Sequence, residues 1–149
     1  RELAQATRYA GSRGVSPFAR SNRWGAGGSA WREEADDRVA CLIQIERATA
    51  LDEVEAIAAL DDVDALYMGP ADLSNDLGLP PDLGNAELCA AAERIARAAV
   101  EQGKAAAIHL PAPESATEMR SVGFSFLSCT FESQLLRVAS ERAAGALRS

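Results

Sequence analysis

A fourfold alternation between short apolar runs and segments of helical periodicity most constrains the fold of this chain. Each run is apolar along nearly its whole length, as expected for a strand that is covered on both faces. Strand–helix–strand alternation predicts parallel pairing with right-handed crossovers. The predicted strands lie within residues 38–46, 64–69, 104–110 and 124–129, and the predicted helices lie within 49–60, 71–78, 85–103, 113–123 and 132–147.

Four strand–helix units leave two α/β architectures open. A closed (β/α)₈ barrel requires eight units over about 250 residues, and this sequence has 149 residues. The chain is therefore predicted to be either a small open α/β sheet or the C-terminal half of a TIM (β/α)₈ barrel, in one partial domain over residues 1–149. The opening RELAQATR reads as the last turns of a helix, so we expect the N-terminal strands of such a barrel to be missing.

Local signals predict where some helices begin and end. In the longest predicted helix, Asn85 is a suitable N-cap and Gly103 a suitable C-terminal stop. Residues 17–24, PFARSNRW, predict a short helix with its proline near the first turn, and residues 31–37, WREEADD, predict another. An acidic group before the second strand is interpreted as a solvated turn: Asp61, Asp62 and Asp64.

Charge and cysteine content exclude several classes of function. The formal net charge is −7, whereas a nucleic-acid surface needs clustered Lys and Arg. No apolar run approaches the roughly 18 residues that a membrane span requires. Cys41, Cys89 and Cys129 are odd in number and widely spaced, unlike a disulfide framework or a zinc motif. We therefore expect a cytoplasmic protein without nucleic-acid or membrane partners.

Two carboxylates follow neighbouring predicted strands. Glu46 ends the first strand, and Gln44 shares its face because strand residues two apart project to the same side. Asp72 lies just beyond the second strand. Adjacent parallel strands lie about 4.8 Å apart, so acids at their ends can bind one ion. Oxygen-only ligation favours Mg²⁺ or Mn²⁺.

Structural roles for the same acids are the alternative. Asp72 is a suitable N-cap for the short helix that follows it. Glu46 could pair with Arg47 or Arg13 at the surface, where ion pairs contribute little to stability. The pattern of residues alone leaves the metal site and these structural roles open.

Residues 41–78, CLIQIERATALDEVEAIAALDDVDALYMGPADLSNDLG, resemble the signature of the HpcH/HpaI family of class II, metal-dependent pyruvate aldolases. That signature is a Gln-x-Glu strand followed by a Gly-Pro-x-Asp-Leu-Ser loop. Further matches lie at residues 8–24, at GKAAAI (103–108) and at VGFSFLSCTFESQLL (122–136). The resemblance covers nearly the whole chain. It implies a TIM barrel of the phosphoenolpyruvate/pyruvate type that associates as a homo-oligomer or with its missing N-terminal half.

The resemblance also implies an activity and a set of site residues. The activity is that of an aldehyde-lyase, which cleaves or forms 4-hydroxy-2-oxo acids through a pyruvate enolate. Examples are 4-hydroxy-2-oxoheptanedioate, from aromatic compound catabolism, and 2-keto-3-deoxy sugar acids. Glu46 and Asp72 match the ligands of a divalent cation (Mg²⁺ or Mn²⁺, with Co²⁺ as a further option). The residues implied for binding the α-keto acid are Gln44, Gly69, Pro70, Ala71 and Asp72, the loop acting through its backbone N–H groups at a helix start.

The sequence departs from the family at other positions. The family's substrate-binding Arg and proton-transferring His lie in strands upstream of this sequence, so full activity is expected to require them. His109 stands where the family usually has an aliphatic residue. A lone His at a strand end is more often a hydrogen-bonded structural residue than a base, so no catalytic residue is assigned and His109 is kept as a candidate. Phe131 replaces a smaller residue and is expected to alter the pocket.

Two other functions are weighed against the aldolase. One is a catalytically incomplete remnant that acts only by association, because half a barrel has open strand edges and an exposed apolar sheet face. The other is a lyase of the citrate-lyase β type that acts on acyl-CoA esters. The second is ranked lower because the sequence has no basic patch of nucleotide size.

Overall fold

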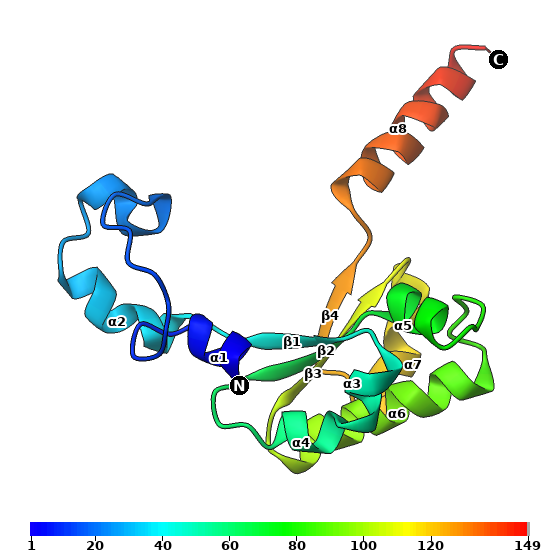
Figure 1. Ribbon diagram of the computed structural model, residues 1–149. Helices are drawn as coiled ribbons and strands as arrows, with labels where there is room; N and C mark the ends of the chain where they lie inside the picture. The colour runs from blue at the N-terminus through cyan, green and yellow to red at the C-terminus, as the bar shows by residue number, and fades with distance from the viewer. Residues whose placement is uncertain (149) are drawn as a thin grey trace.

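The computed structural model describes residues 1–148, which form one four-stranded parallel sheet with helices (Figure 1). The sheet order is the chain order, so each strand pairs with the next one in the sequence. All four predicted strands are confirmed, with shorter bounds than the apolar runs. The strands are β1 (Leu42–Ile45), β2 (Ala65–Met68), β3 (Ala105–Leu110) and β4 (Phe126–Cys129).

The strand register gives the sheet one apolar face and one mixed face. A row of residues at paired positions, one from each strand, packs under the helices: Ile45, Met68, Ile108 and Leu127. The adjacent row lies on the opposite face because side chains alternate along a strand. That row consists of Gln44, Tyr67, Ala107 and Phe126.

Helices cover only the apolar face of the sheet (Figure 1). Val54, Leu88, Ile95 and Phe124 pack there against the buried row and are fully or almost fully buried. Within the part of the chain that the structure describes, no element covers the mixed face, and Phe126 is 49% exposed there. The expectation that both faces are covered is therefore wrong for the described residues.

The helices following β1 to β3 are α3 (Ala48–Asp52), α4 (Val54–Ala58), α5 (Pro70–Asp76), α6 (Ala86–Glu101), the 3₁₀ turn η2 (Pro113–Ser115) and α7 (Ala116–Val122).

The ends of α6 confirm the capping signals. The side chain of Asn85 accepts hydrogen bonds from the N–H groups of Glu87 and Leu88 at 3.0 and 3.2 Å. The helix ends at Glu101 with Gln102 as its C-cap, and Gly103 has a φ of +66°, a conformation that glycine adopts at little cost.

The N-terminal segment contains α1 (Glu2–Ala6), the 3₁₀ segment η1 (Arg20–Gly25) and α2 (Ala30–Arg38). The short helix predicted from Pro17 is only partly correct. Arg23 and Trp24 have positive φ angles of 48° and 58°, which no regular helix contains. The Nδ2 of Asn22 donates to the carbonyl oxygen of Pro17 at 2.7 Å. This local bond competes with helix formation.

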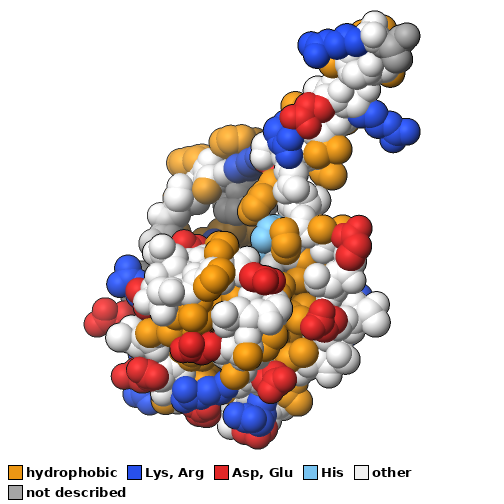
Figure 2. Space-filling model, turned by 90° about the vertical axis from the view of Figure 1, so that its right-hand side faces the viewer, with side chains coloured by type: hydrophobic (Ala, Val, Ile, Leu, Met, Phe, Trp, Pro, Cys, Tyr) orange, Lys and Arg blue, Asp and Glu red, His pale blue; other side chains and the backbone are white. Residues whose placement is uncertain are grey.

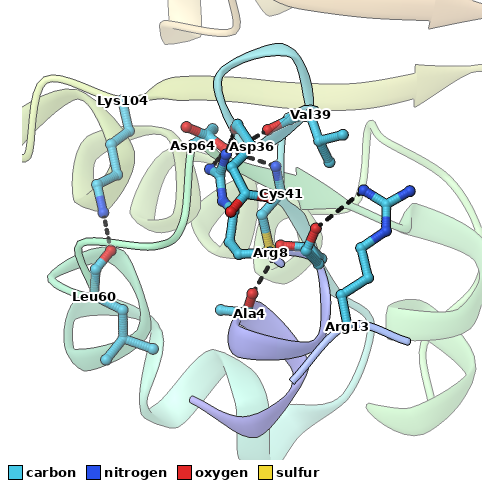
Figure 3. Close-up of polar contacts among 10 residues, drawn as sticks. Ala4, Arg8, Arg13, Asp36, Val39, Cys41, Leu60, Asp64 and Lys104 are labelled. Carbon is cyan, nitrogen blue, oxygen red and sulfur yellow. Dashed lines mark hydrogen bonds and ion pairs between the residues drawn. The ribbon is translucent and has the colours of Figure 1, made fainter. Parts of the chain in front are cut away.

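Arg8 ties the N-terminal segment to the amino ends of the strands (Figure 3). Its guanidinium donates to the carbonyl oxygens of Asp36 and Val39, the latter at 2.8 Å, and to Oδ2 of Asp64 at 2.9 Å. The same Asp64 oxygen accepts a bond of 2.6 Å from the N–H of Cys41. Asp61 and Asp62 lie in an exposed turn, as interpreted, and Asp64 is exposed as well. The carboxylate of Asp64 in addition joins two segments of the chain, which the sequence did not predict.

Helix α8 (Glu132–Ala146) follows β4 and extends away from the sheet (Figure 1). Figure 2 shows hydrophobic side chains between charged ones along this helix. Leu135, Leu136 and Val138 are exposed, and Arg137 pairs with Glu141 one turn later at 2.7 Å. Among residues 1–148 no helix has the length and apolar character needed to cross a membrane.

Candidate active site at the carboxyl ends of the strands

A cavity of about 470 Å³ lies on the mixed face of the sheet, at the carboxyl ends of the strands. Parallel α/β folds bind ligands at this end. The cavity contains all the residues predicted for substrate binding, together with His109 and Phe131. Its lining consists of Leu42, Gln44, Tyr67, Gly69, Pro70, Ala71, Asp72, His109 and Phe131.

Gly69 brings the two halves of the predicted site together. Its N–H donates to the carbonyl oxygen of Ile45 at 3.2 Å, which extends the pairing of β2 with β1 up to Glu46. A Cβ at this position would lie 2.7 Å from Nε2 of Gln44 and 3.3 Å from Cβ of Glu46. Because glycine has no side chain, Gln44 and Glu46 can pack directly against the loop that carries Asp72.

The loop amides are not equivalent. Pro70 has no N–H, and the N–H of Gly69 is already bonded within the sheet. The N–H groups of Ala71 and Asp72 have no hydrogen-bond partner among the described residues. They lie in the first turn of α5, where backbone N–H groups attract negative charge. Of the loop residues predicted to hold a carboxylate through backbone N–H groups, Ala71 and Asp72 are the two with a free donor.

Neither structural role considered for the two acids is found. The N-cap of α5 is Gly69, so Asp72 lies inside the first turn and does not cap the helix. Glu46 is half-buried and forms no ion pair with any residue that the structure describes. Arg13 instead lies over the ring of Tyr9, 4.5 Å from its centroid. Both carboxylates are therefore available to a ligand.

Two hydrogen bonds fix the positions of the loops that carry these acids. Oδ2 of Asp76, on α5, accepts from the N–H of Ala48, which follows Glu46 closely in the chain, at 2.7 Å. The buried Ser74 donates from Oγ to the carbonyl oxygen of Ala71 at 2.8 Å. Sequence reasoning missed the Asp76 contact because it depends on how α5 folds back towards β1, whereas the Ser74 bond is local to α5.

The donor set fits a hard divalent cation. Mg²⁺ and Mn²⁺ are commonly held by one or two carboxylates, with water and substrate oxygens completing the shell. Glu46 and Asp72 provide two such groups. Residues 1–148 hold no cluster of three or more His, Cys, Asp or Glu side chains that could bind a metal. The pair therefore suits an open, substrate-assisted site and does not suit a closed zinc site with four protein ligands.

Tyr67 and His109, which line the cavity, are joined through Ser128 in a hydrogen-bonded group that the sequence did not predict. The hydroxyl of Tyr67 lies 2.5 Å from Oγ of Ser128, which lies 3.1 Å from Nδ1 of His109. The ring of Phe131 stacks on His109 with centroids 4.5 Å apart. Phe131 therefore lines the pocket, as expected from its size. The only available signal for Tyr67 and Ser128 was that both are polar residues in predicted strands.

A parallel half-barrel with a cavity at the carboxyl ends of its strands, lined by apolar and polar side chains, is the arrangement of a TIM-barrel enzyme. The model of the HpcH/HpaI aldolase/citrate lyase family matches residues 1–139, and the chain belongs to this family. It is 36% identical over 145 residues to the 2-keto-3-deoxy-L-rhamnonate aldolase of Klebsiella pneumoniae. That match covers 95% of this chain and 54% of the relative.

Solved structures agree with this assignment. An HpcH/HpaI aldolase/citrate lyase family protein from Burkholderia cenocepacia J2315 superposes with a TM-score of 0.86 at 30% identity, over 98% of this chain and 59% of that one. A citrate lyase beta subunit from M. tuberculosis, complexed with oxaloacetate and magnesium, superposes with a TM-score of 0.54 at 23% identity, over 64% of this chain and 48% of that one, and shows likeness of fold alone. The chain spans about half the length of the relatives that it matches.

Proposed function

We propose that this chain carries the metal- and pyruvate-binding part of a class II aldolase that cleaves or forms 4-hydroxy-2-oxo acids. One observation supports the proposal above all. Glu46 and Asp72, which follow neighbouring strands, have no partner among the described residues. Asp72 lines the cavity with the Gln44 amide, whereas Glu46 is not a lining residue and packs beside Gly69, with its Cβ 3.3 Å from the position of a Cβ there. Two unpaired carboxylates close to an amide are suited to a cation and an α-keto acid.

Each residue has a role in this proposal. Glu46 and Asp72 would hold Mg²⁺ or Mn²⁺, which supplies Lewis-acid polarisation of the keto acid when bound. The Gln44 amide donates to an oxygen of the pyruvyl group. The free N–H groups of Ala71 and Asp72 orient the substrate carboxylate at the start of α5. Together these contacts hold the keto acid in one orientation, with its C3 towards the rest of the cavity.

The cavity lining favours one class of 4-hydroxy-2-oxo acid. None of the residues that line it is Lys or Arg. An aldehyde with its own carboxylate, as released from 4-hydroxy-2-oxoheptanedioate, finds no cationic partner in this lining. A hydroxylated aldehyde, as released from a 2-keto-3-deoxy sugar acid, finds Tyr67 and His109. We therefore favour the sugar acids, in keeping with the activity for which the Klebsiella relative is named. An acyl-CoA lyase is disfavoured, because it would need cationic groups for the nucleotide.

The first experiment is calorimetric titration of Mn²⁺ into the protein with and without pyruvate. We expect binding in the micromolar range that pyruvate strengthens about tenfold, because ligands that share an ion support one another. The substitutions Asp72→Ala and Glu46→Gln should each abolish Mn²⁺ binding. Asp37→Ala, which removes an exposed carboxylate on α2, is the matched control and should bind as the wild type does.

Circular dichroism shows whether each protein is folded, so that loss of the site is distinguished from loss of the fold. A folded wild-type protein that binds no Mn²⁺ would contradict the proposal and favour the remnant that acts only by association. Retained binding in both Asp72→Ala and Glu46→Gln would show that the ion sits elsewhere.

A further inference from the structure

Three polar side chains on β2, β3 and β4 form a hydrogen-bonded chain across the uncovered face of the sheet. Tyr67 and Ser128 belong to strands that are not neighbours, so the tyrosine side chain must cross β3 to reach the serine. Ala107 is the register partner of Tyr67 on β3 and is fully buried, although it belongs to the uncovered face. The small alanine side chain gives the tyrosine room to cross. His109, opposite Ser128 in the register, completes the chain.

Counting donors shows what this chain offers to the cavity. In one arrangement Tyr67 donates to Ser128 and Ser128 donates to Nδ1 of His109, which leaves Nε2–H of His109 as a free donor. In the reverse arrangement Nδ1–H donates to Ser128 and Ser128 donates to Tyr67, which leaves the tyrosine O–H free. Nε2 of His109 has no partner among residues 1–148. Either way, one donor remains for a ligand.

The position of this donor is fixed by packing. Pairing of β2 with β3 ends at Met68 and Ile108, so His109 is next to Gly69 at the site of the proposed keto-acid contacts. The imidazole ring is held on one side by Phe131, with an interplanar angle of 29°. A ring that is stacked and hydrogen-bonded loses little further entropy when it binds a ligand.

We propose that Tyr67, Ser128 and His109 form a specificity-determining subsite that hydrogen-bonds a neutral oxygen on the C3 side of the pyruvyl group. The oxygen is a hydroxyl or carbonyl oxygen, because the lining residues offer it hydrogen bonds and no cation. The inference rests on the proposed function, because that function places the pyruvyl group beside Gly69. It adds Tyr67 and His109, which line the cavity, and Ser128, which links them by hydrogen bonds, as the residues that select the group joined to C3.

The test compares two ligands of the same shape in the Mn²⁺-loaded protein. 3-Hydroxypyruvate has a hydroxyl where 2-oxobutanoate has a methyl group, and neither has the C4 hydroxyl that retro-aldol cleavage needs. Calorimetry gives the ratio of their affinities. We expect Tyr67→Phe, Ser128→Ala and His109→Leu each to lower this ratio about tenfold, the value of one hydrogen bond. Affinity for pyruvate, which has no oxygen in that position, should stay within about twofold of the wild type.

Matched variants make the result specific. Ser121→Ala removes an exposed hydroxyl on α7 and should leave the ratio unchanged. Ser128→Thr keeps the hydroxyl on a strand that accepts threonine well and should retain most of the ratio.

Three results would overturn the subsite. A ratio unchanged in all three variants would show that the chain does not meet the ligand. Equal loss of affinity for both ligands and for pyruvate would show a structural role. A folded wild-type protein that binds Mn²⁺ but not pyruvate would overturn the proposed function and the subsite with it.

Discussion

Replacing Gly69 with alanine tests whether the Gln44 amide acts on the keto acid. Gly69 has a φ of −97°, which any L residue can adopt, so the substitution adds no backbone strain. The new Cβ would lie 2.7 Å from Nε2 of Gln44, whereas ordinary van der Waals contact begins at 3.4 Å. The amide must therefore move by about 0.7 Å, and Glu46, 3.3 Å from the new Cβ, by far less.

The cost of this movement falls on binding and not on stability. The end of a glutamine side chain can rotate away, and alanine restricts the unfolded chain more than glycine does. The free energy of unfolding should therefore change by less than about 1 kcal/mol. A displaced amide loses a hydrogen bond to an anionic ligand, which is worth about 1.5–3 kcal/mol. We expect pyruvate affinity to fall about tenfold or more, with Mn²⁺ affinity within about twofold of the wild type.

Calorimetric titration of pyruvate into the Mn²⁺-loaded protein measures the affinity, and urea denaturation measures the stability. Gly14→Ala is the matched control, because a Cβ there has no neighbour within 4 Å. It should leave both affinities unchanged. Wild-type affinity for pyruvate in Gly69→Ala, or an equal loss of Mn²⁺ affinity, would refute the reasoning.

Two further predictions concern stability. Arg8→Ala should lower the free energy of unfolding by about 2 kcal/mol in urea denaturation, because three acceptors lose a charged donor; Arg20→Ala, at an exposed position, is the control. Arg94 donates two hydrogen bonds to Glu55 and lowers the pKa of that carboxyl from 4.5 to about 2. The contribution of the Arg94–Glu55 pair to stability is therefore complete above pH 4.5 and is lost as the pH falls towards about 2. The melting temperature of the wild type should fall more over that range than that of Glu55→Gln, and parallel curves would contradict the assignment.

The fold was largely predictable because its signals are local. Apolar runs located every strand, and Asn85 with Gly103 located the ends of α6. The short helix predicted within residues 17–24 is only partly correct because Asn22 bonds to Pro17 in place of continuing a regular helix. Segments whose conformation depends on one side-chain contact give no periodic signal.

The site was predictable in part, for a related reason. Glu46 and the loop at Gly69 stand next to recognisable strand ends, so their proximity follows from parallel pairing. Tyr67 and Ser128 meet across an intervening strand, and that contact depends on the register and on a small residue at Ala107. A single sequence does not give the register between strands.

The four strands lie in the sheet in the same order as in the chain. This order has a consequence for how the chain folds during synthesis. When β2 leaves the ribosome its partner β1 has already been made, and the same holds for β3 and β4. None of these four described strands has to wait for a partner that is synthesised later, so the sheet can grow in one direction as translation proceeds. At each stage the most recently added strand is the edge of the sheet, and β2, β3 and β4 in turn pair with that edge.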